Sequence, residues 1–395
     1  MKISAPSFLD DVRLQRLFAA LDGQGEELRV VGGAVRNHFM GKPVSEIDLA
    51  ATATPDVVIA RAHKAGLKSV PTGIDHGTIT VVVDHVPFEV TTLREDIDTD
   101  GRRATVIFGR DFEKDALRRD FTFNALSVGA DGLVHDYAEG MRDIEARHVR
   151  FIGDPSTRIR EDYLRILRYF RFHAAFADGP ADPVALDAIL HQRHGLSGLS
   201  RERMRAELMK LLETNGAADT IRLMSGFGLV MPLIGGAYSA TRLARIPRES
   251  DAILKLAALA VLKREDATRL QEALRLSNAE AQRLMRAAEA SEKFARATPP
   301  DTHDMRVSLL RFGRQATCDA LMLAGFDAAC AQAQSLAQPK LPIGGADLIA
   351  RGMSPGKAIG DMLGEIEKQW ILKDFPESPE AFEQIVAQAL ATRAK

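Results

Sequence analysis

The chain has 395 residues, of which 46% are hydrophobic and 27% are charged, and its formal net charge at pH 7 is -2. This is the composition of an ordinary globular protein, and the length predicts two to four domains instead of one core. The balanced charge excludes a global basic field, so any site for a polyanion has to be local.

The two cysteines, Cys318 and Cys330, lack the spacing of a zinc site. They favour free thiols in a reducing compartment. The first residues carry acids and no apolar segment typical of a signal peptide. No apolar stretch approaches the roughly 20 residues that a membrane-spanning helix needs. We therefore expect a cytoplasmic protein without a membrane partner.

The first 140 residues or so mix strands and helices. Apolar spacing predicts a helix over 7–22, and a short strand follows at Leu28–Val31. Gly32-Gly33 ends this strand, and a helix is expected from Ala34 to Met40.

The next elements are a strand at Ile47–Ala50 and a helix that Thr54-Pro55 opens and that runs to about Ala65. Two β-branched runs, 77–83 and 87–93, predict a hairpin. After Asp154-Pro155 amphipathic helices dominate, so composition places a domain boundary near 145–155. Further boundaries are expected near the Pro- and Gly-rich stretches 232–247, 298–304 and 339–356.

Two carboxylates, Glu46 and Asp48, follow the glycine turn with one residue between them. On a strand they would share one face, about 6–7 Å apart along the backbone. That spacing suits a pair of Mg²⁺ ions, which accept carboxylate oxygens and activate nucleotidyl transfer. Glu89, on a neighbouring predicted strand, is placed to be the third acid. The alternative is the solvent face of an edge strand.

The turn before these acids has the residues of an anion site. Gly32 and Gly33 let a backbone and a helix N-terminus approach an anion closely. Arg36, one turn into the helix, adds a guanidinium fork for phosphate. Although a lone Gly-Gly turn is weak evidence, its combination with the acid pair favours a nucleotide site.

Residues 158–173 read RIREDYLRILRYFRFH, a helical pattern with arginines at every third position. Asp162, Arg165, Arg168 and Arg171 would form a slowly winding stripe that spans roughly 13 Å. Cytosine and adenine share an amino donor beside a ring-nitrogen acceptor, which a carboxylate beside a guanidinium complements. Asp162 and Arg165 could then read the base while Arg168 and Arg171 face phosphates. The alternative is a solvated basic face.

A third segment, LRRDFTFNALS at 117–127, lies between these two. Arg119 is a candidate triphosphate contact, and Asp120 could anchor that arginine or the sugar. As a bare pattern, the segment could equally be a helix end that runs into a strand.

Together these segments resemble the class II tRNA nucleotidyltransferases, the CCA-adding family, which includes the related bacterial poly(A) polymerases. The resemblance is carried by GGAVRNHFMG…EIDLAAT, EVTTLRED, DGRRATVIFGRDFEKDALRRD, RRDFTFNAL and EDYLRILRYFRF. The stretch LPIGGADLIARGMSPGKAIG near the end is similar to the family's C-terminal element, more loosely.

The resemblance implies an α/β nucleotidyltransferase head with a small mixed five-stranded sheet, followed by an all-α neck, body and tail. We assign the head to 1–150, the neck to 151–225, the body to 226–300 and the tRNA-binding tail to 301–395. The implied reaction adds CCA to tRNA 3′ ends from CTP and ATP with two Mg²⁺ ions. Monomer and homodimer both remain open.

Carried onto this sequence, the resemblance implies metal, catalytic and nucleotide-binding roles. The acids Glu46 and Asp48 would bind metal, and the predicted strand position of Glu89 adds it as a third catalytic acid. The nucleotide site would comprise Gly32, Gly33, Arg36, Arg119, Asp120, Asp162, Arg165, Arg168 and Arg171.

Two positions depart from the family pattern, because Glu46 and Asn37 stand where the family usually has Asp. Three rival functions share the motifs: a poly(A) polymerase, an enzyme that adds only CC or only A, and a catalytically silent RNA-binding homologue.

Overall fold

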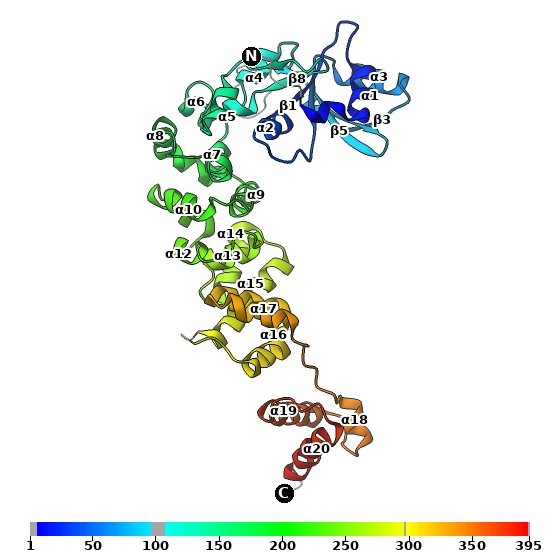
Figure 1. Cartoon of the computed structure of the whole chain (residues 1–395), viewed down its shortest axis with the longest axis vertical. Coiled ribbons are helices and arrows are strands. Elements are labelled where there is room, and N and C mark those ends of the chain that lie inside the picture. Colours follow the sequence, from blue (N-terminus) through cyan, green and yellow to red (C-terminus); the bar gives the residue numbers. More distant parts are fainter. Residues whose placement is uncertain (1–5, 96–106, 296–297, 394–395) are drawn as a thin grey trace. The chain divides into compact units, whose positions relative to one another are not determined.

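The computed structural model describes residues 6–95, 107–295 and 298–393 (Figure 1). The chain divides into two compact units, Met1–Thr220 and Ile221–Lys395, and the boundary falls within helix α10 (Ala217–Gly226). The first unit therefore extends well beyond the compositional change at 145–155. The finer division into head, neck, body and tail stays a prediction. The quoted motifs DGRRATVIFGRDFEKDALRRD and EVTTLRED lie partly outside the described residues.

The first unit contains a mixed seven-stranded sheet in the order β3-β4-β5-β2-β1-β8-β9, and a separate two-stranded pair β6-β7. All pairs in the large sheet are antiparallel except β2 with β5. The strands are β1 (Leu28–Val31), β2 (Asp48–Ala51), β3 (Lys68–Gly73), β4 (Thr78–Val83), β5 (Val86–Thr92), β6 (Arg94–Glu95), β7 (Ile107–Phe108), β8 (Ser127–Gly129) and β9 (Val134–His135).

The α/β class is as expected, but the sheet has seven strands instead of five. Four of the seven strands correspond to segments predicted individually from the sequence, and the other three, β3, β8 and β9, are short or lie at the sheet edge. Pro71 and Gly73 interrupt β3, and most of its side chains are partly or fully exposed, so it lacks the alternation that identifies a strand in sequence. The predicted hairpin is confirmed: Asp84 and His85, both with positive φ, connect β4 to β5.

Helices α1 and α3 pack together and contact the β3-β4-β5 side of the sheet (Figure 1). Local sequence explains where these helices start. Asp11 caps α1 by accepting the N–H of Arg13, and Pro55 occupies the first turn of α3. The α-helices of the first unit are α1 (Val12–Leu21), α2 (Gly33–Phe39), α3 (Pro55–Lys64), α4 (Phe112–Leu117), α5 (Gly140–Glu145), α6 (Pro155–Glu161), α7 (Leu164–Phe176), α8 (Pro183–Gln192) and α9 (Arg201–Leu212).

The second unit is helical throughout its described residues. Trp370 lies in a buried cluster built mainly from α18, α19 and α20, and its indole N–H donates to the carbonyl of Pro376. Cys318 and Cys330 are buried free thiols between α16 and α17, as expected. The helices are α11 (Val230–Ile234), α12 (Ala240–Leu243), α13 (Ala252–Ala260), α14 (Glu265–Leu274), α15 (Asn278–Ser291), α16 (Thr302–Ala324), α17 (Asp327–Ser335), α18 (Gly345–Ala350), α19 (Lys357–Leu372) and α20 (Pro379–Arg393). No described helix is long and apolar enough to cross a bilayer.

An aromatic cluster attaches helix α7 to the sheet region within the first unit. Its rings have centroid separations of 4.8–6.3 Å and come from the segment after α4, from Phe151 before α6, and from α7. Burying such rings stabilises the packing and fixes the helix that carries the arginines. The members are Phe121, Phe123, Phe151, Tyr169, Phe172 and Phe176.

Replacing Phe121 by alanine should lower the local free energy of unfolding of the first unit by about 3–5 kcal/mol, because its ring is fully buried and the cavity left behind cannot close completely. Hydrogen exchange of amides in β1 and α7 measures this change. Phe108→Ala is the control, since Phe108 is 38% exposed. Equal protection of α7 in both variants would contradict the role of the cluster.

Candidate active site

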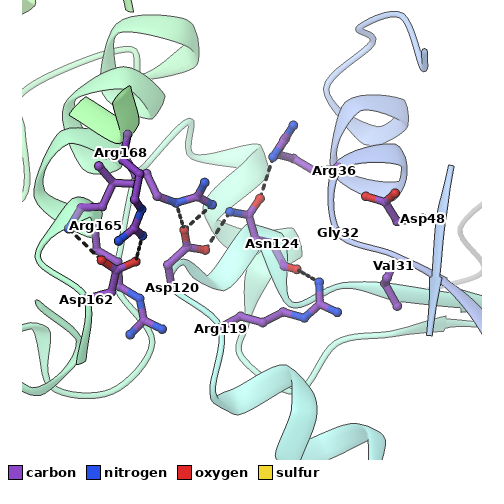
Figure 2. A pocket seen from close by; sticks show the side chains of 13 residues that line it. Val31, Gly32, Arg36, Asp48, Arg119, Asp120, Asn124, Asp162, Arg165 and Arg168 are labelled. Carbon is purple, nitrogen blue, oxygen red and sulfur yellow. Dashed lines mark hydrogen bonds and ion pairs between the residues drawn. The ribbon is translucent and has the colours of Figure 1, made fainter. Parts of the chain in front are cut away.

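A cavity of about 400 Å³ in the first unit gathers residues from three segments far apart in the sequence (Figure 2). One wall comes from the glycine turn and β2, one from the segment after α4, and one from α7 and α9. We call it the arginine cavity. It is lined by Val31, Gly32, Gly33, Arg36, Asp48, Arg119, Asp120, Asn124, Asp162, Leu164, Arg165, Arg168 and Arg203.

The predicted glycine turn is present between β1 and α2. Gly32 has φ 64°, a conformation that favours glycine, and a Cβ there would lie 3.1 Å from Nη1 of Arg119. The Gly32 N–H donates to the carbonyl of Leu126, so this amide is already used within the fold. The turn therefore serves chiefly to bring the backbone close to the Arg119 guanidinium.

Arg36 is a half-buried residue whose guanidinium is oriented by neutral groups. Its Nη1 donates to Oδ1 of Asn124 at 2.6 Å, and its Nε and Nη2 donate to Oδ1 of Asn37 at 3.1 and 2.9 Å. Burial, together with repulsion from Arg171 and Arg168, outweighs Asp120 and lowers the pKa of Arg36 to about 10. Asn37 thus orients the guanidinium without neutralising it, and a bound polyanion would relieve the repulsion.

Arg119 is held by two contacts at the base of the cavity. Its Nη2 lies 3.1 Å from Oδ2 of Asp115, and its Nη1 donates to the carbonyl of Asn124 at 3.2 Å. Burial alone would raise the pKa of Asp115, but Arg119 and Arg118 outweigh burial and lower it. The carboxylate therefore stays ionised and fixes the direction of the arginine.

Asp120 is a buried anchor. Its Oδ2 accepts from Nε of Arg168 at 2.6 Å, and its Oδ1 accepts from the Asn124 side chain and the Phe121 N–H, each at 2.9 Å (Figure 2). Burial would raise the pKa of Asp120, but Arg168 and these hydrogen bonds outweigh it and lower the pKa. Asp120 was expected to anchor Arg119 or the sugar, but the arginine that it holds is Arg168, and Arg119 pairs with Asp115 instead.

The pair expected to read the base lies in the cavity with different partners. Asp162 was predicted to lie in a continuous helix with Arg165, but it lies in a break, with φ -155° and ψ 106°, between α6 and α7. Its Oδ1 accepts the Leu164 N–H at 3.1 Å, and its Oδ2 accepts from Arg203 at 2.7 Å. Aspartate commonly interrupts a helix in this way, because its side chain competes for backbone donors.

Arg165 forms its ion pair with Glu161 and not with Asp162. The ion pair of Asp162 is with Arg203. Nη1 also donates to the carbonyl of Arg158 at 2.9 Å and Nη2 donates to the carbonyl of Arg118 at 3.3 Å. These contacts hold the guanidinium across two segments.

Arg171 was grouped with the cavity arginines but does not line the cavity. Its Nε donates to the buried carboxylate of Glu207 at 2.5 Å. Its guanidinium carbon lies 3.9 Å from the ring centroid of Phe172, a ring that Arg36 and Arg168 also approach, at 5.1 and 5.4 Å. Arg171 therefore shares the Phe172 ring with Arg36 and Arg168, while its charge repels Arg36.

The three predicted acids lie near one another, and Asp48 is the one that lines this cavity. Asp48 is the first residue of β2 and pairs in parallel register with Glu89 of β5. Glu46, expected on the same strand face as Asp48, lies in the loop before β2. Val31 is the register partner of Asp48 and the last residue of β1. Because Gly32 then turns the chain into α2, the residues before Asp48 have no partner on β1.

Burial and repulsion from Glu89 and Glu46 raise the pKa of Asp48, against an opposing effect of Arg119. Asp48, Glu46 and Glu89 also line a second cavity of about 630 Å³, which we call the acid cavity. Within the described residues no three acid, histidine or cysteine side chains converge into a ready-made metal cluster. Mg²⁺ needs only one or two carboxylates besides waters and substrate phosphates, so these oxygen donors fit it.

Sequence reasoning missed four residues that shape the site. Asn124 bridges Arg36 and Asp120, Arg203 holds Asp162, and Asp115 and Glu207 hold arginines. Asn124 lies inside the quoted motif RRDFTFNAL, which offered a signal. Asp115 lies four residues before Arg119, a helical spacing that also offered a signal, whereas Glu207 and Arg203 pair over 36 and 41 residues and leave no local pattern.

These features, a Gly-Gly turn beside paired strand acids and a cluster of held arginines, define a nucleotidyltransferase. Residues 28–150 match the poly A polymerase head domain, and residues 182–236 match the probable RNA- and SrmB-binding site of polymerase A.

Similar proteins extend over nearly the whole chain. The human mitochondrial CCA tRNA nucleotidyltransferase 1 is 34% identical, covering 94% of this chain and 89% of the relative. The CCA-adding enzyme of Limosilactobacillus fermentum is 31% identical, covering 89% and 90%. The crystal structure of the Bacillus stearothermophilus CCA-adding enzyme in complex with CTP has a TM-score of 0.78 at 27% identity, covering 97% and 98%. The chain belongs to the CCA tRNA nucleotidyltransferase family.

We expect Asp120→Asn to lower the free energy of unfolding of the first unit by about 3 kcal/mol at pH 7, because Arg168 loses its buried carboxylate. The folded-state pKa of Asp120 lies below its ordinary value. The ionised carboxylate therefore stabilises the fold above its unfolded pKa of about 3.9, and this contribution is lost as the pH falls through the folded-state pKa.

Urea unfolding at pH 7, 5 and 3 measures the difference between wild type and variant. The difference should be equal at pH 7 and 5 and smaller at pH 3. Asp187→Asn, at a side chain that is 73% exposed, is the control and should match the wild type. A difference that does not change with pH would contradict the ion pair with Arg168.

Proposed function

We propose that this chain adds CCA to tRNA 3′ ends from CTP and ATP without a nucleic-acid template, releasing pyrophosphate. The observation that carries the proposal is the arginine cavity. It combines a candidate base reader, Asp162 with Arg165, and candidate triphosphate contacts, Arg36, Arg119 and Arg168, with the acid Asp48. The named CCA-adding relatives support the same activity.

Asp162 is suited to read an exocyclic amino group. Each carboxylate oxygen has two lone pairs, and the hydrogen bonds from Leu164 and Arg203 use one on each oxygen. The remaining lone pairs can accept an amino hydrogen of cytosine or adenine. Arg165 can donate to the ring nitrogen that both bases share.

In the proposed reaction the RNA 3′-oxygen bonds to the α-phosphorus, and the bond from that phosphorus to the β-phosphate oxygen breaks. The hydroxyl proton passes to solvent, and pyrophosphate leaves. Two Mg²⁺ ions, held by Glu46 and Asp48 with Glu89 nearby, would neutralise the developing charge. The arginines orient the triphosphate, so most of the catalysis comes from positioning and electrostatics.

We further propose that tRNA lies along the helical part of the chain, where local Lys and Arg side chains contact its backbone. The match of residues 182–236 to an RNA-binding region supports this. A cytoplasmic location is part of the proposal, favoured by the two free cysteines.

A poly(A) polymerase is the second candidate, because residues 28–150 match a head domain described for that enzyme. An RNA extension assay distinguishes the poly(A) polymerase from the CCA-adding enzyme. Transcripts that end before CCA, after CC, or after the complete CCA should be incubated with CTP or ATP separately. We expect C addition to the first and a single A addition to the second. Long A runs without C would overturn the proposal.

Asp48→Asn should reduce nucleotide transfer by on the order of a thousandfold, because the charge at the junction of both cavities is lost. Binding of tRNA, measured by gel shift, should be unchanged. Mg²⁺ should raise the unfolding temperature of the wild type, since it relieves the repulsion that raises the pKa of Asp48, and should do so less in the variant. Equal stabilisation of both proteins would remove Asp48 from the metal site.

Glu46→Asp should retain transfer, whereas Glu46→Gln should lose about a hundredfold, because the amide keeps the length but not the charge. Initial rates at several Mg²⁺ concentrations measure both variants. The Asp variant should require more Mg²⁺ because its shorter arm reaches less far. If Glu46→Gln is as active as wild type, Glu46 has no part in metal binding.

A further inference from the structure

The acid cavity lies beside the arginine cavity but differs from it in composition. It is bounded by the start of α1, the loop before β2, and strands β4 and β5. Besides Asp11 and the three acids already described, it has an apolar surface formed by Val44, Ile47, Pro87 and Phe88. At about 630 Å³ it falls within the roughly 300–1,000 Å³ range of small-ligand sites.

Strand order places the two cavities on opposite sides of β2. The arginine cavity lies toward β1, with Val31 and Gly32 in its wall, whereas the acid cavity extends to Glu89 of β5 and Thr80 of β4. Among the described lining residues, Asp48 alone is shared by both. A group at Asp48 can therefore be approached from either side.

Nucleotidyl transfer needs this arrangement, because the attacking and leaving oxygens lie roughly in line on opposite sides of the phosphorus. With the triphosphate among the arginines, pyrophosphate leaves on the β1 side, and the attacking hydroxyl has to come from the β5 side. We propose that the acid cavity receives the 3′-terminal nucleoside of the RNA acceptor, and that Arg13 contacts its phosphate. This inference rests on the proposed nucleotidyl transfer.

Arg13 is held in a fixed direction at this cavity. Its Nε and Nη2 donate to the two carboxylate oxygens of Asp11 at 2.9 and 2.5 Å, and the same carboxylate caps α1. The Arg13 side chain is 41% exposed, so it remains accessible to an RNA phosphate. A bidentate carboxylate pair fixes the plane of the guanidinium and leaves its outer nitrogen to meet a phosphate oxygen.

The charges also select the occupant. Four acids, Asp11, Glu46, Asp48 and Glu89, and one arginine line the acid cavity, so its net negative charge disfavours a second triphosphate there. A nucleoside presents a neutral base and sugar to the apolar wall and a single phosphate to Arg13. Its 3′-hydroxyl then faces the acids.

Arg13→Ala tests the contact, and Arg16→Ala is the matched control. Arg16 lies on the same helix, pairs with Asp84 at 2.7 Å, and does not line the acid cavity. At saturating CTP, Arg13→Ala should lower kcat/KM for the RNA acceptor about tenfold, the effect of one charge-assisted contact. The Kd for CTP without RNA should be unchanged, and Arg13→Lys should recover part of the loss.

If the wild type extends RNA and Arg13→Ala has the same kcat/KM for the RNA acceptor, the inference is wrong while the proposed function stands. The inference also fails if that variant weakens CTP binding as much as RNA use. Melting temperatures of all three variants exclude a folding defect through Asp11.

A second measurement does not depend on turnover. A tRNA transcript that ends in 4-thiouridine should, on irradiation, crosslink to peptides that contain residues 44–47 or 86–88. Crosslinks confined to residues 162–203 would place the acceptor end elsewhere and overturn the inference. A wild-type protein that crosslinks as expected but transfers no nucleotide would instead contradict the proposed function.

Discussion

The repulsion between guanidinium groups around one small cavity is the constraint on which the first unit depends. Arg36, Arg119, Arg165, Arg168 and Arg203 all line a space of about 400 Å³. Each is held by an oxygen acceptor, and the acceptors include buried carboxylates as well as amide and carbonyl oxygens. This matched set keeps the cations in place before any ligand is bound. A polyanion therefore finds its partners already oriented, and binding needs little rearrangement.

Aromatic packing sets the distance between the two sides of that cavity. Phe121 and Phe123 from the sheet side interdigitate with Phe172 and Tyr169 of α7. Since α7 carries Arg165 and Arg168, the same contacts position the candidate base reader relative to Gly32 and Asp48. The functional side chains thus come from short sequence segments, and the aromatic cluster fixes the distances between them.

Much of this could be predicted from sequence, because the informative signals are local. The strand Leu28–Val31, the Gly32-Gly33 turn and the hairpin at Asp84-His85 each follow from a few adjacent residues. The failures share a different cause. Asp162 continues a helical apolar pattern, yet its backbone is extended because its carboxylate binds Leu164 and Arg203. The edge strand β3 lacks a buried face, and the role of Arg203 depends on a partner 41 residues away. Contacts between residues that are distant in the sequence determine the structure at such positions, and the hydrophobic periodicity of the sequence does not reveal these contacts.

The position of Glu46 explains how a longer acid can occupy it. Asp48 is fixed by the pleat and by its register with Glu89, so one more methylene there would displace the carboxylate relative to its neighbours. Glu46 belongs to the connecting loop, where no ladder sets the direction of its side chain. The position of its carboxylate depends on both the length of the side chain and the backbone path of the loop, so a change in one can offset a change in the other. The two acids are therefore under unequal geometric constraint: the register of the sheet fixes the position of Asp48, whereas the loop at Glu46 accommodates a longer side chain.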